Sequence, residues 1–316
     1  MEIGIGLPMW LKGATPAFLL DWAQRAEAGP FSSLGTLDRV AYHNFEPLTM
    51  YAAVAATTKR IRLTTSVLLA TTRNAGILAK QAATVDAISG GRLTLGLGIG
   101  GREDDFKAAP EPIRGRGRRF EEQLDVMRRI WAGQPVGDGV GPIGPSPARA
   151  GGPEILIGGY TPAAVARVGR WGNGFISGGR ADIEQVRGLY AAAEQSWRAA
   201  GRTGRPRFVA CVYYALGDEV QQIAVQNQTQ YYSFMGPNVE RMAHGFINNA
   251  AAVAQTVKGV RIERIKGSLR YAHLPAESQP VSFGVHDEVA AHYRAKAGEF
   301  EPHATTLDYV VAAAAG

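Results

Sequence analysis

Two short glycine-containing segments follow apolar runs of the chain and have the composition of ligand-binding turns. They are Gly158, Gly159, Tyr160 and Thr161 in the first, and Gly100, Gly101 and Arg102 in the second. Glycine lets backbone N–H groups approach an anion closely, and the start of a helix adds partial positive charge. The guanidinium of Arg102 has the geometry to bind phosphate through two parallel hydrogen bonds. These residue types therefore point to a bound anion.

Both segments also have a purely structural interpretation. Thr161 before Pro162 is the order typical of a helix start, with a threonine cap and proline in the first helical position. Arg102 is followed directly by the carboxylates of Glu103, Asp104 and Asp105, so a solvated arginine beside these acids is the alternative to a phosphate clamp. The sequence leaves this alternative open, and for the glycine turn the two roles are compatible.

Other catalytic patterns are missing from the sequence. The histidines show no H-x-x-x-H or H-E-x-x-H spacing, which argues against a metal site, and no G-x-S-x-G segment occurs, which argues against a serine hydrolase. Cys211 is the single cysteine and lies in an apolar run without basic neighbours. We interpret it as a buried packing residue rather than a nucleophile. One cysteine also fits a reducing cytoplasm.

Composition narrows the class of protein further. The chain has 316 residues, of which 46% are apolar and 20% charged, so it can bury a large core as one barrel or two medium domains. No apolar run is long enough to span a membrane and no secretory signal is evident, so we expect a cytoplasmic protein. The formal charge is +6, but the arginines are scattered. We therefore do not expect nucleic-acid binding.

Alternating strands and helices are predicted to position the residues that carry chemistry. Short apolar strands are predicted at residues 3–7, 33–37, 61–69, 93–97, 154–157, 174–177 and 207–214, and helices at 16–28, 46–57, 75–88, 117–132, 161–168, 183–200 and from 217 to about 258. Strands that are apolar on both faces are typical of parallel sheets. Seven strand–helix units within roughly 250 residues predict an α/β fold of the TIM (β/α)8 barrel type. A doubly wound sheet is the competitor, but no G-x-G-x-x-G turn follows the first strand.

Three segments, in this order along the chain, carry a resemblance to a known family. They are Thr65-Ser66-Val67-Leu68-Leu69, the helix–Ser89-Gly90-Gly91-Arg92–strand stretch at residues 79–98, and Ile157-Gly158-Gly159-Tyr160-Thr161-Pro162. With them, residues 1 to about 257 resemble the luciferase-like monooxygenase superfamily. That superfamily comprises flavin-dependent monooxygenases and deazaflavin (F420)-dependent reductases and dehydrogenases.

The resemblance implies a redox cofactor, FMN or alternatively coenzyme F420, at the carboxyl ends of the barrel strands. The residues expected to bind it are Leu7, Ser66, Val67, Gly100, Arg102, Gly158, Gly159, Tyr160, Thr161 and Ser177. The resemblance also implies that the glycine turn holds the cofactor phosphate. It further implies a non-prolyl cis peptide bond between Ser66 and Val67, beneath the flavin ring, with an ordinary buried strand end as the alternative.

Asp38 and Arg39 end the second predicted strand and are the expected catalytic residues. F420-dependent relatives often carry an acid followed by histidine at this place, so Arg39 departs from that pattern. The departure weakens a mechanism in which a base takes a hydroxyl proton, and it favours FMN over F420. Asp38 is expected to bond the edge of the cofactor ring, and a surface loop aspartate is the alternative.

The last part of the chain does not fit the family pattern. Residues 260–265 alternate charged and apolar side chains, and Lys266-Gly267 leads into a second strand-like segment, so we predict a hairpin with one solvated face. We expect a barrel domain over residues 1–257, with an atypical or missing eighth unit, and an atypical segment over residues 258–316. That segment faintly resembles the osmotically inducible/organic hydroperoxide reductase-like family, especially at residues 281–286 and 304–313.

The leading hypothesis is a luciferase-like monooxygenase that uses reduced FMN and acts on a small molecule. The resemblance also suggests a homodimer, with a flavin reductase as a partner. An F420-dependent reductase or dehydrogenase is the first alternative. A non-catalytic flavin-binding homologue is the second, and a peroxide-detoxifying protein, suggested by the C-terminal segment, is the third.

Overall fold

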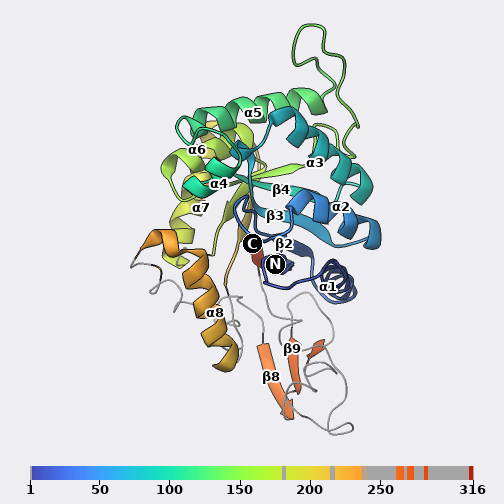
Figure 1. Cartoon of the computed structure of the whole chain (residues 1–316), viewed down its shortest axis with the longest axis vertical. Helices are drawn as coiled ribbons and strands as arrows, with labels where there is room; N and C mark the ends of the chain where they lie inside the picture. Colours follow the sequence, from blue (N-terminus) through green and yellow to red (C-terminus); the bar gives the residue numbers. More distant parts are fainter. Residues whose placement is uncertain are drawn as a thin grey trace. The chain divides into compact units, whose positions relative to one another are not determined.

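The computed structural model describes residues 2–179, 183–213, 218–236, 239, 261–266, 269–273, 281–283 and 313–315. The chain forms two compact units (Figure 1). The larger unit is Gly6–Cys211, and the smaller unit is Met1–Ile5 together with Val212–Ala315. Every residue predicted to belong to the functional site lies in the larger unit.

Strands and helices alternate along the larger unit, as the sequence predicts. They are β1 (Glu2–Gly6, which begins in the smaller unit), α1 (Pro16–Ala28), β2 (Ser33–Thr36), α2 (Pro47–Thr57), β3 (Arg62–Leu69), η1 (Ala70–Thr72), α3 (Ala75–Ser89), β4 (Leu93–Gly98), α4 (Glu103–Ala108), α5 (Arg116–Trp131), β5 (Glu154–Gly158), α6 (Pro162–Trp171), β6 (Gly174–Ser177), α7 (Ile183–Ala199) and β7 (Arg207–Ala210). The predicted bounds of α1 are confirmed at both ends, whereas β7 ends earlier than predicted.

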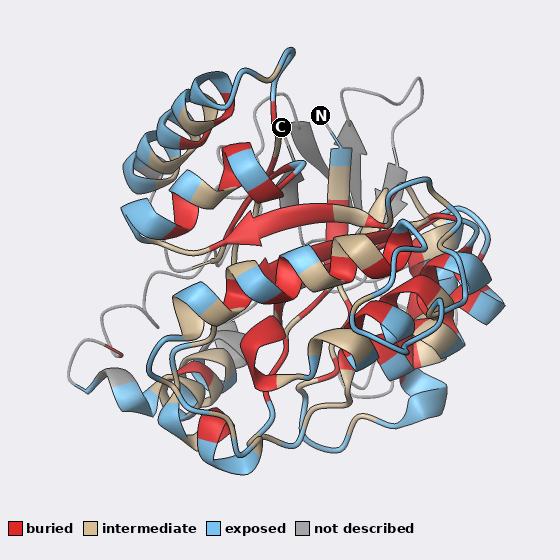
Figure 2. Ribbon diagram, turned by 90° about the horizontal axis from the view of Figure 1, so that it is seen from above, coloured by how far each residue is buried: buried red, intermediate tan, exposed pale blue. Residues whose placement is uncertain are grey.

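The strands β2 to β7 form one parallel sheet in which each strand pairs with the next one along the chain. The end of β1 adjoins β2, because the Leu7 N–H donates to the Gly35 carbonyl at 2.7 Å. The sheet is curled, and the strands are buried while the helices bury one face and expose the other (Figure 2). Consecutive parallel pairing with helical crossovers places the carboxyl ends of all these strands at one edge.

Capping residues explain where several helices begin and end. Thr15 accepts a hydrogen bond from the Phe18 N–H at 3.2 Å, and Asn74 accepts one from Ile77 N–H at 3.1 Å, so each fills an otherwise unpaired donor at a helix start. Gly90 ends α3 with φ of 66°, a left-handed conformation that favours glycine. Local chemistry of this kind is readable from sequence, which is why these boundaries were predictable.

The segment with the most specific family resemblance proves to be structural. Arg92 donates hydrogen bonds to the hydroxyl of Thr58 and to backbone carbonyls of Ala55, Thr58, Ile61 and Ser89. Its partners lie at the ends of α2 and α3 and just before β3, at the amino edge of the sheet. Burial lowers the pKa of Arg92, and the charge of Glu27 opposes that shift. Arg92 therefore links α2, α3 and β3 at the edge of the sheet opposite the predicted site.

One α-helix of the larger unit was not predicted. The short helix α4 lies in the polar stretch after β4, where Asp105 and Phe106 are its two buried residues. Six residues with one buried apolar side chain give no helical periodicity to detect. The helix matters because its acidic side chains contact arginines at the carboxyl edge, as described below.

The smaller unit contains α8 (Asp218–Tyr231), η2 (Ser233–Met235), β8 (Arg261–Lys266), β9 (Leu269–His273), β10 (Val281–Phe283) and β11 (Ala313–Ala315). β8 and β9 pair antiparallel, which confirms the predicted pairing of these two segments, and β10 pairs antiparallel with β9.

Strand β11 pairs with β1, and the two strands run antiparallel, with Glu2 opposite Ala315. A regular eighth barrel strand would be parallel. The predicted atypical eighth unit is therefore confirmed, and the fold is an incomplete α/β TIM barrel.

The predicted boundary at residue 257 and the end of the helix predicted to reach about residue 258 fall outside the described residues. Within the described part of the chain, every helix is too short or too polar to traverse a bilayer.

Candidate functional site

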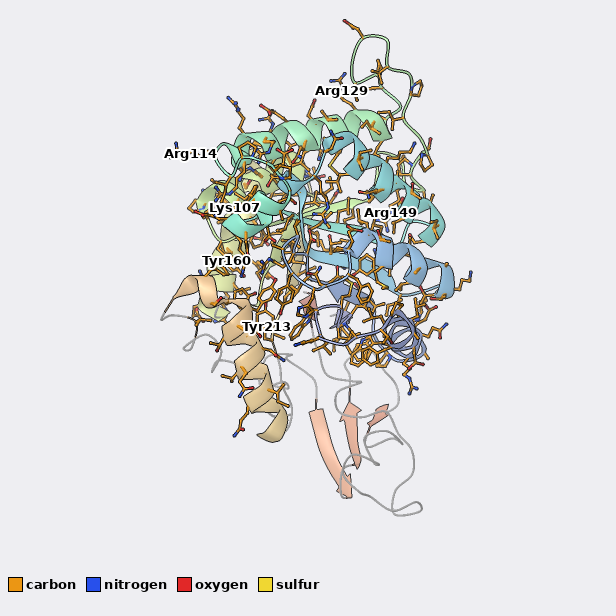
Figure 3. All side chains as sticks on the ribbon, viewed as in Figure 1. Lys107, Arg114, Arg129, Arg149, Tyr160 and Tyr213 are labelled. Carbon is orange, nitrogen blue, oxygen red and sulfur yellow. The ribbon has the colours of Figure 1, made fainter. Side chains whose placement is uncertain are left out.

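The larger unit brings predicted site residues of six strands to one edge, and Leu7, which follows β1, is one of them. Asp38 and Arg39 follow β2, Ser66 and Val67 lie in β3, Gly100 and Arg102 follow β4, Gly158 ends β5 with the glycine turn after it, and Ser177 ends β6. In Figure 3, Tyr160 of this turn lies on the same side of the unit as Lys107 of α4, and Arg149 lies on the other side. The carboxyl edge is the usual place for the active site of a barrel enzyme.

Val67 of β3 packs against the carboxyl ends of β4 and β5. The Ser66–Val67 peptide bond is cis, as the resemblance implied, and the pairing of β3 with β4 shifts register between Thr65 and Leu68. The Val67 side chain packs on two glycines. A Cβ at Gly98 would lie 2.8 Å from Val67 Cγ2, and a Cβ at Gly158 would lie 2.7 Å from Val67 Cγ1. Glycine at both places is therefore required for this packing.

The turn after β5 packs tightly against the helix that follows it. A Cβ at Gly159 would lie 2.5 Å from the Cβ of Ala164 in α6. Thr161 accepts a hydrogen bond from the Ala164 N–H at 3.3 Å, and Pro162 begins the helix. The structural interpretation of this turn, a threonine cap followed by proline, is thus confirmed. The turn lies at the start of the ten-residue helix α6. Binding of an anion there stays a prediction.

Tyr160 joins the turn to the next strand of the sheet. A Cβ at Gly178 would lie 2.1 Å from the Tyr160 hydroxyl oxygen, so that hydroxyl rests over the backbone directly after β6. Ser177, the last residue of β6, is fully buried, and its carbonyl accepts the Cys211 N–H at 3.0 Å. Leu7, directly after β1, is likewise buried. Leu7 and Ser177 therefore line the interior beneath the edge, and their contact with a cofactor stays a prediction.

The segment after β4 needs glycine for two reasons. Gly100 has φ of 67°, in the left-handed region, and a Cβ there would lie 3.2 Å from Cε2 of Phe106. Its carbonyl accepts a hydrogen bond from the Arg116 Nε at 3.1 Å. Gly100 thereby allows α4 to fold back on the end of β4.

Arg102 pairs with one of its acidic neighbours. Its Nε and a terminal nitrogen lie 3.2 and 2.9 Å from the two carboxylate oxygens of Asp104. The Arg102 hydrogen bond lowers the pKa of Asp104, and the charge of Arg39 adds to that shift. The alternative interpretation, an arginine beside these acids, is therefore what the structure shows. A role for Arg102 in binding phosphate stays a prediction.

Arg39 is buried and held by two carboxylates of α4. Its Nε donates to Asp105 at 2.7 Å, and a terminal nitrogen donates to Asp104 at 2.8 Å. Asp105 also accepts the backbone N–H groups of Val40 and Ala41, at 2.9 and 2.8 Å. Arg39 and Asp105 thus fasten the loop after β2 to α4, and a catalytic role for Arg39 stays a prediction.

Asp38 is equally engaged, with 1% of its side chain exposed. Its Oδ2 accepts the Leu69 N–H at 2.7 Å, and the two terminal nitrogens of Arg73 donate to Oδ2 and Oδ1 at 2.7 and 3.1 Å. Burial lowers the pKa of Arg73, but the charges of Asp38 and Glu46 outweigh it, and the net shift is upward. The alternative of a surface loop aspartate is wrong, because this carboxylate is buried. Sequence reasoning did not identify Arg73.

Cys211 lies nearer to the predicted site than its sequence suggested. Burial raises the pKa of the thiol to about 11, and the nearby Ser66 hydroxyl opposes that rise. The raised pKa argues against a nucleophile, as predicted, although the residue is half-buried rather than fully buried. Since Cys211 follows β7 and Ser66 lies in β3, the two side chains meet across the interior of the curled sheet. No local signal in the sequence could reveal that contact.

Comparison with known proteins decides the family. The model of the luciferase-like monooxygenase family matches residues 3–312 of this chain. The protein belongs to this family. As a luciferase-like protein it is an oxidoreductase, because members of the family are flavin- or F420-dependent oxidoreductases or monooxygenases. The match includes residues 281–286 and 304–312, so it does not support the faint resemblance of this region to hydroperoxide reductase-like proteins.

Individual relatives are distant. The luciferase-like chain is 28% identical to an uncharacterized protein of Mycobacterium tuberculosis over 238 residues. The matched segment covers 72% of this chain and 83% of that one. An F420-dependent secondary alcohol dehydrogenase in complex with an F420-acetone adduct has a TM-score of 0.67 at 19% identity, over 82% of this chain and 89% of that one. The oxygenating constituent of 3,6-diketocamphane monooxygenase from Pseudomonas putida, in complex with FMN, has a TM-score of 0.59 at 19% identity, over 81% and 79%. At these identities the solved structures show the shared fold.

Proposed function

We propose that this protein is a luciferase-like monooxygenase that binds FMN at the carboxyl edge of its sheet. One observation carries the proposal: Val67 packs directly on Gly98 and Gly158, so the Ser66–Val67 segment and the glycine turn belong to one contiguous surface. The first is the expected platform for a flavin ring, and the second is the expected phosphate site. A single cofactor could therefore touch both.

The turn after β5 has the chemistry to hold a phosphate. Val67 and Ala164 fill the side-chain space of Gly158 and Gly159, so an anion would approach the backbone of this turn, and α6 begins with its partial positive charge at Pro162. The hydroxyl of Thr161 and the backbone around it lie at that helix start. The residues present thus fit the phosphate of FMN.

The Ser66–Val67 segment would orient the ring. Both residues are half-buried in the second half of β3, with Cys211 beside Ser66. FMN, when bound, would supply the redox chemistry and the reaction with oxygen. The protein's own part is to bind the phosphate, present one face of the ring to the substrate, and exclude water from it.

Arg39 favours FMN and a monooxygenase over the F420 alternative. Oxidation of an alcohol needs a base that takes the hydroxyl proton, and a guanidinium that stays charged cannot serve as that base. Here Arg39 is fixed by Asp104 and Asp105. An F420-dependent reductase, which needs no such base, is the alternative function.

Titration of the purified protein with FMN and, separately, with F420 tests the proposal. We expect flavin fluorescence to show saturable FMN binding that is tighter than F420 binding. Tighter binding of F420 would favour the alternative, and failure of both cofactors to bind would remove the enzymatic function altogether.

We further propose a cytoplasmic homodimer that acts on a small molecule and receives reduced FMN from a flavin reductase. The dimer is supported by the outer face of α3, where Ile77 and Ile88 are exposed. These two residues lie on the same face of the helix, about three turns apart, and the dimer itself is what the family resemblance suggests.

A further inference from the structure

The buried pair of Asp38 and Arg73 holds one residue of β3 at both of its backbone polar atoms. The Leu69 N–H donates to Asp38 at 2.7 Å, and the Leu69 carbonyl accepts from Arg73 at 3.0 Å. Arg73 in turn donates hydrogen bonds to both carboxylate oxygens of Asp38. The three residues therefore form one closed hydrogen-bonded unit in which neither the backbone nor the carboxylate is left without a partner.

This unit lies directly after the irregular part of β3. The pairing of β3 with β4 is regular up to Thr65 opposite Leu95 and resumes at Leu68 opposite Leu97. Ser66 and Val67 lie between these points, outside the regular pairing. Their position is therefore set by the regular strand before them and by the anchored residues Leu68 and Leu69 after them.

We infer that Asp38 is a positioning residue, which holds the Ser66–Val67 segment in place for the cofactor ring by anchoring the backbone of Leu69. The inference rests on the proposed function for its ligand. It revises the role expected from the sequence, in which Asp38 itself bonds the ring. With 1% of its side chain exposed, the carboxylate has no surface to offer a ligand, and its oxygens already accept three hydrogen bonds.

Other charges near the pair allow a matched control. Glu46 approaches a terminal nitrogen of Arg73 at 3.3 Å, and its other oxygen caps α2 by accepting the Thr49 N–H at 2.7 Å. Glu46 is 38% exposed and has no hydrogen bond to Leu69. A Glu46→Gln variant thus removes a charge from Arg73 while the anchor on Leu69 remains.

The test compares Asp38→Asn with Glu46→Gln in the full-length protein by two measurements. The first is the dissociation constant of FMN. The second, made without any flavin, is the rate at which Cys211 reacts with an aromatic disulfide reagent. Cys211 is the single cysteine and lies beside Ser66, so its reactivity reports on the segment directly.

We expect Asp38→Asn to weaken FMN binding about tenfold and to speed the Cys211 reaction by a similar factor, because a buried charge-assisted anchor is lost. Glu46→Gln should change either value by less than about twofold, since the pair it breaks is partly exposed. Wild-type values for both measurements in Asp38→Asn would overturn the inference.

A milder variant covers the case in which Asp38→Asn does not fold. Arg73→Lys keeps the positive charge but loses the fork that grips Asp38 and the Leu69 carbonyl. It should shift both measurements in the same direction, and wild-type values there would overturn the inference as well. If the wild-type protein binds no FMN, the proposed function fails, whereas the Cys211 rate still decides whether Asp38 holds the segment.

Discussion

Val67 and Gly158 lie on strands β3 and β5, with β4 between them, and pack against each other. A Cβ at position 158 would come within 2.7 Å of Val67 Cγ1. The contact is possible because β4 contributes Gly98 at the same level, which lets the valine reach across. Two glycines and one valine thus bring the expected ring platform and the expected phosphate turn together.

The first prediction concerns this contact. Gly158→Ala should lower the melting temperature and weaken FMN binding, because the added methyl group collides with Val67. Overpacking of this kind costs about 1–3 kcal/mol, and each kcal/mol lowers the Tm of a domain of this size by about 2–4 °C. Thermal unfolding and FMN titration measure the two effects.

A second substitution shows whether the collision is the cause. Val67→Ala in the Gly158→Ala background should recover much of the lost stability. Gly188→Ala in α7 is the matched control, since a Cβ there meets nothing within 4 Å. It should raise stability slightly, by about 0.5–1 kcal/mol, because alanine favours helix. Equal destabilisation by Gly188→Ala would contradict the packing explanation.

The second prediction separates the family's most specific segment from function. Arg92→Ala should destabilise the protein by about 3 kcal/mol, because it leaves several buried carbonyl groups unpaired. FMN affinity of the folded protein should stay at the wild-type value, since Arg92 lies at the opposite edge. Urea unfolding gives the free energy of unfolding. The control is Arg118→Ala, an 88% exposed side chain, which should change stability by less than about 0.5 kcal/mol.

Helix boundaries and Arg92 show what the sequence can and cannot predict. The start of α1 at Pro16 and the end of α3 next to Gly90 follow from local chemistry, and both were predicted. Arg92 was found as part of a motif, but its purely structural role was not. A motif records that residues belong together, whereas the edge of the sheet at which they act emerges only after folding.

The third prediction concerns the thiol of Cys211. Because burial raises its pKa to about 11, the reactive thiolate is a small fraction at pH 8. The rate of alkylation should therefore rise about tenfold per pH unit from pH 7 to pH 10, and bound FMN should slow it further. Iodoacetamide labelling followed by mass spectrometry measures the rate. A rate that levels off by about pH 10 would show an ordinary exposed thiol instead, whose pKa is about 8.5.

The fourth prediction concerns assembly. If the outer face of α3 forms a dimer, Ile77→Lys should yield monomers, because a charge is costly to bury in an apolar interface. Ile223→Lys on α8 is the matched control, since both isoleucines are 57% exposed. Sedimentation velocity distinguishes the species. A dimer that survives Ile77→Lys would place the interface elsewhere.

The parts of the site that escaped prediction are contacts between distant segments. Asp38 and Arg73 come from different strand ends, and Cys211 meets Ser66 across the interior of the sheet. Nothing in the residues near Asp38 distinguishes a buried anchor from a surface acid. The helix α4 was missed because it is short and polar, although its Asp105 fixes the neighbouring Arg39. Such pairings depend on tertiary structure alone.

The most direct measurement compares the affinity of the wild-type protein for FMN and for riboflavin, which differ only in the phosphate. If the turn at Gly159 and Thr161 holds the phosphate and Val67 supports the ring, FMN should bind at least about tenfold more tightly, and high salt should narrow the gap. Equal affinity for the two flavins, or no affinity for either, would contradict the account.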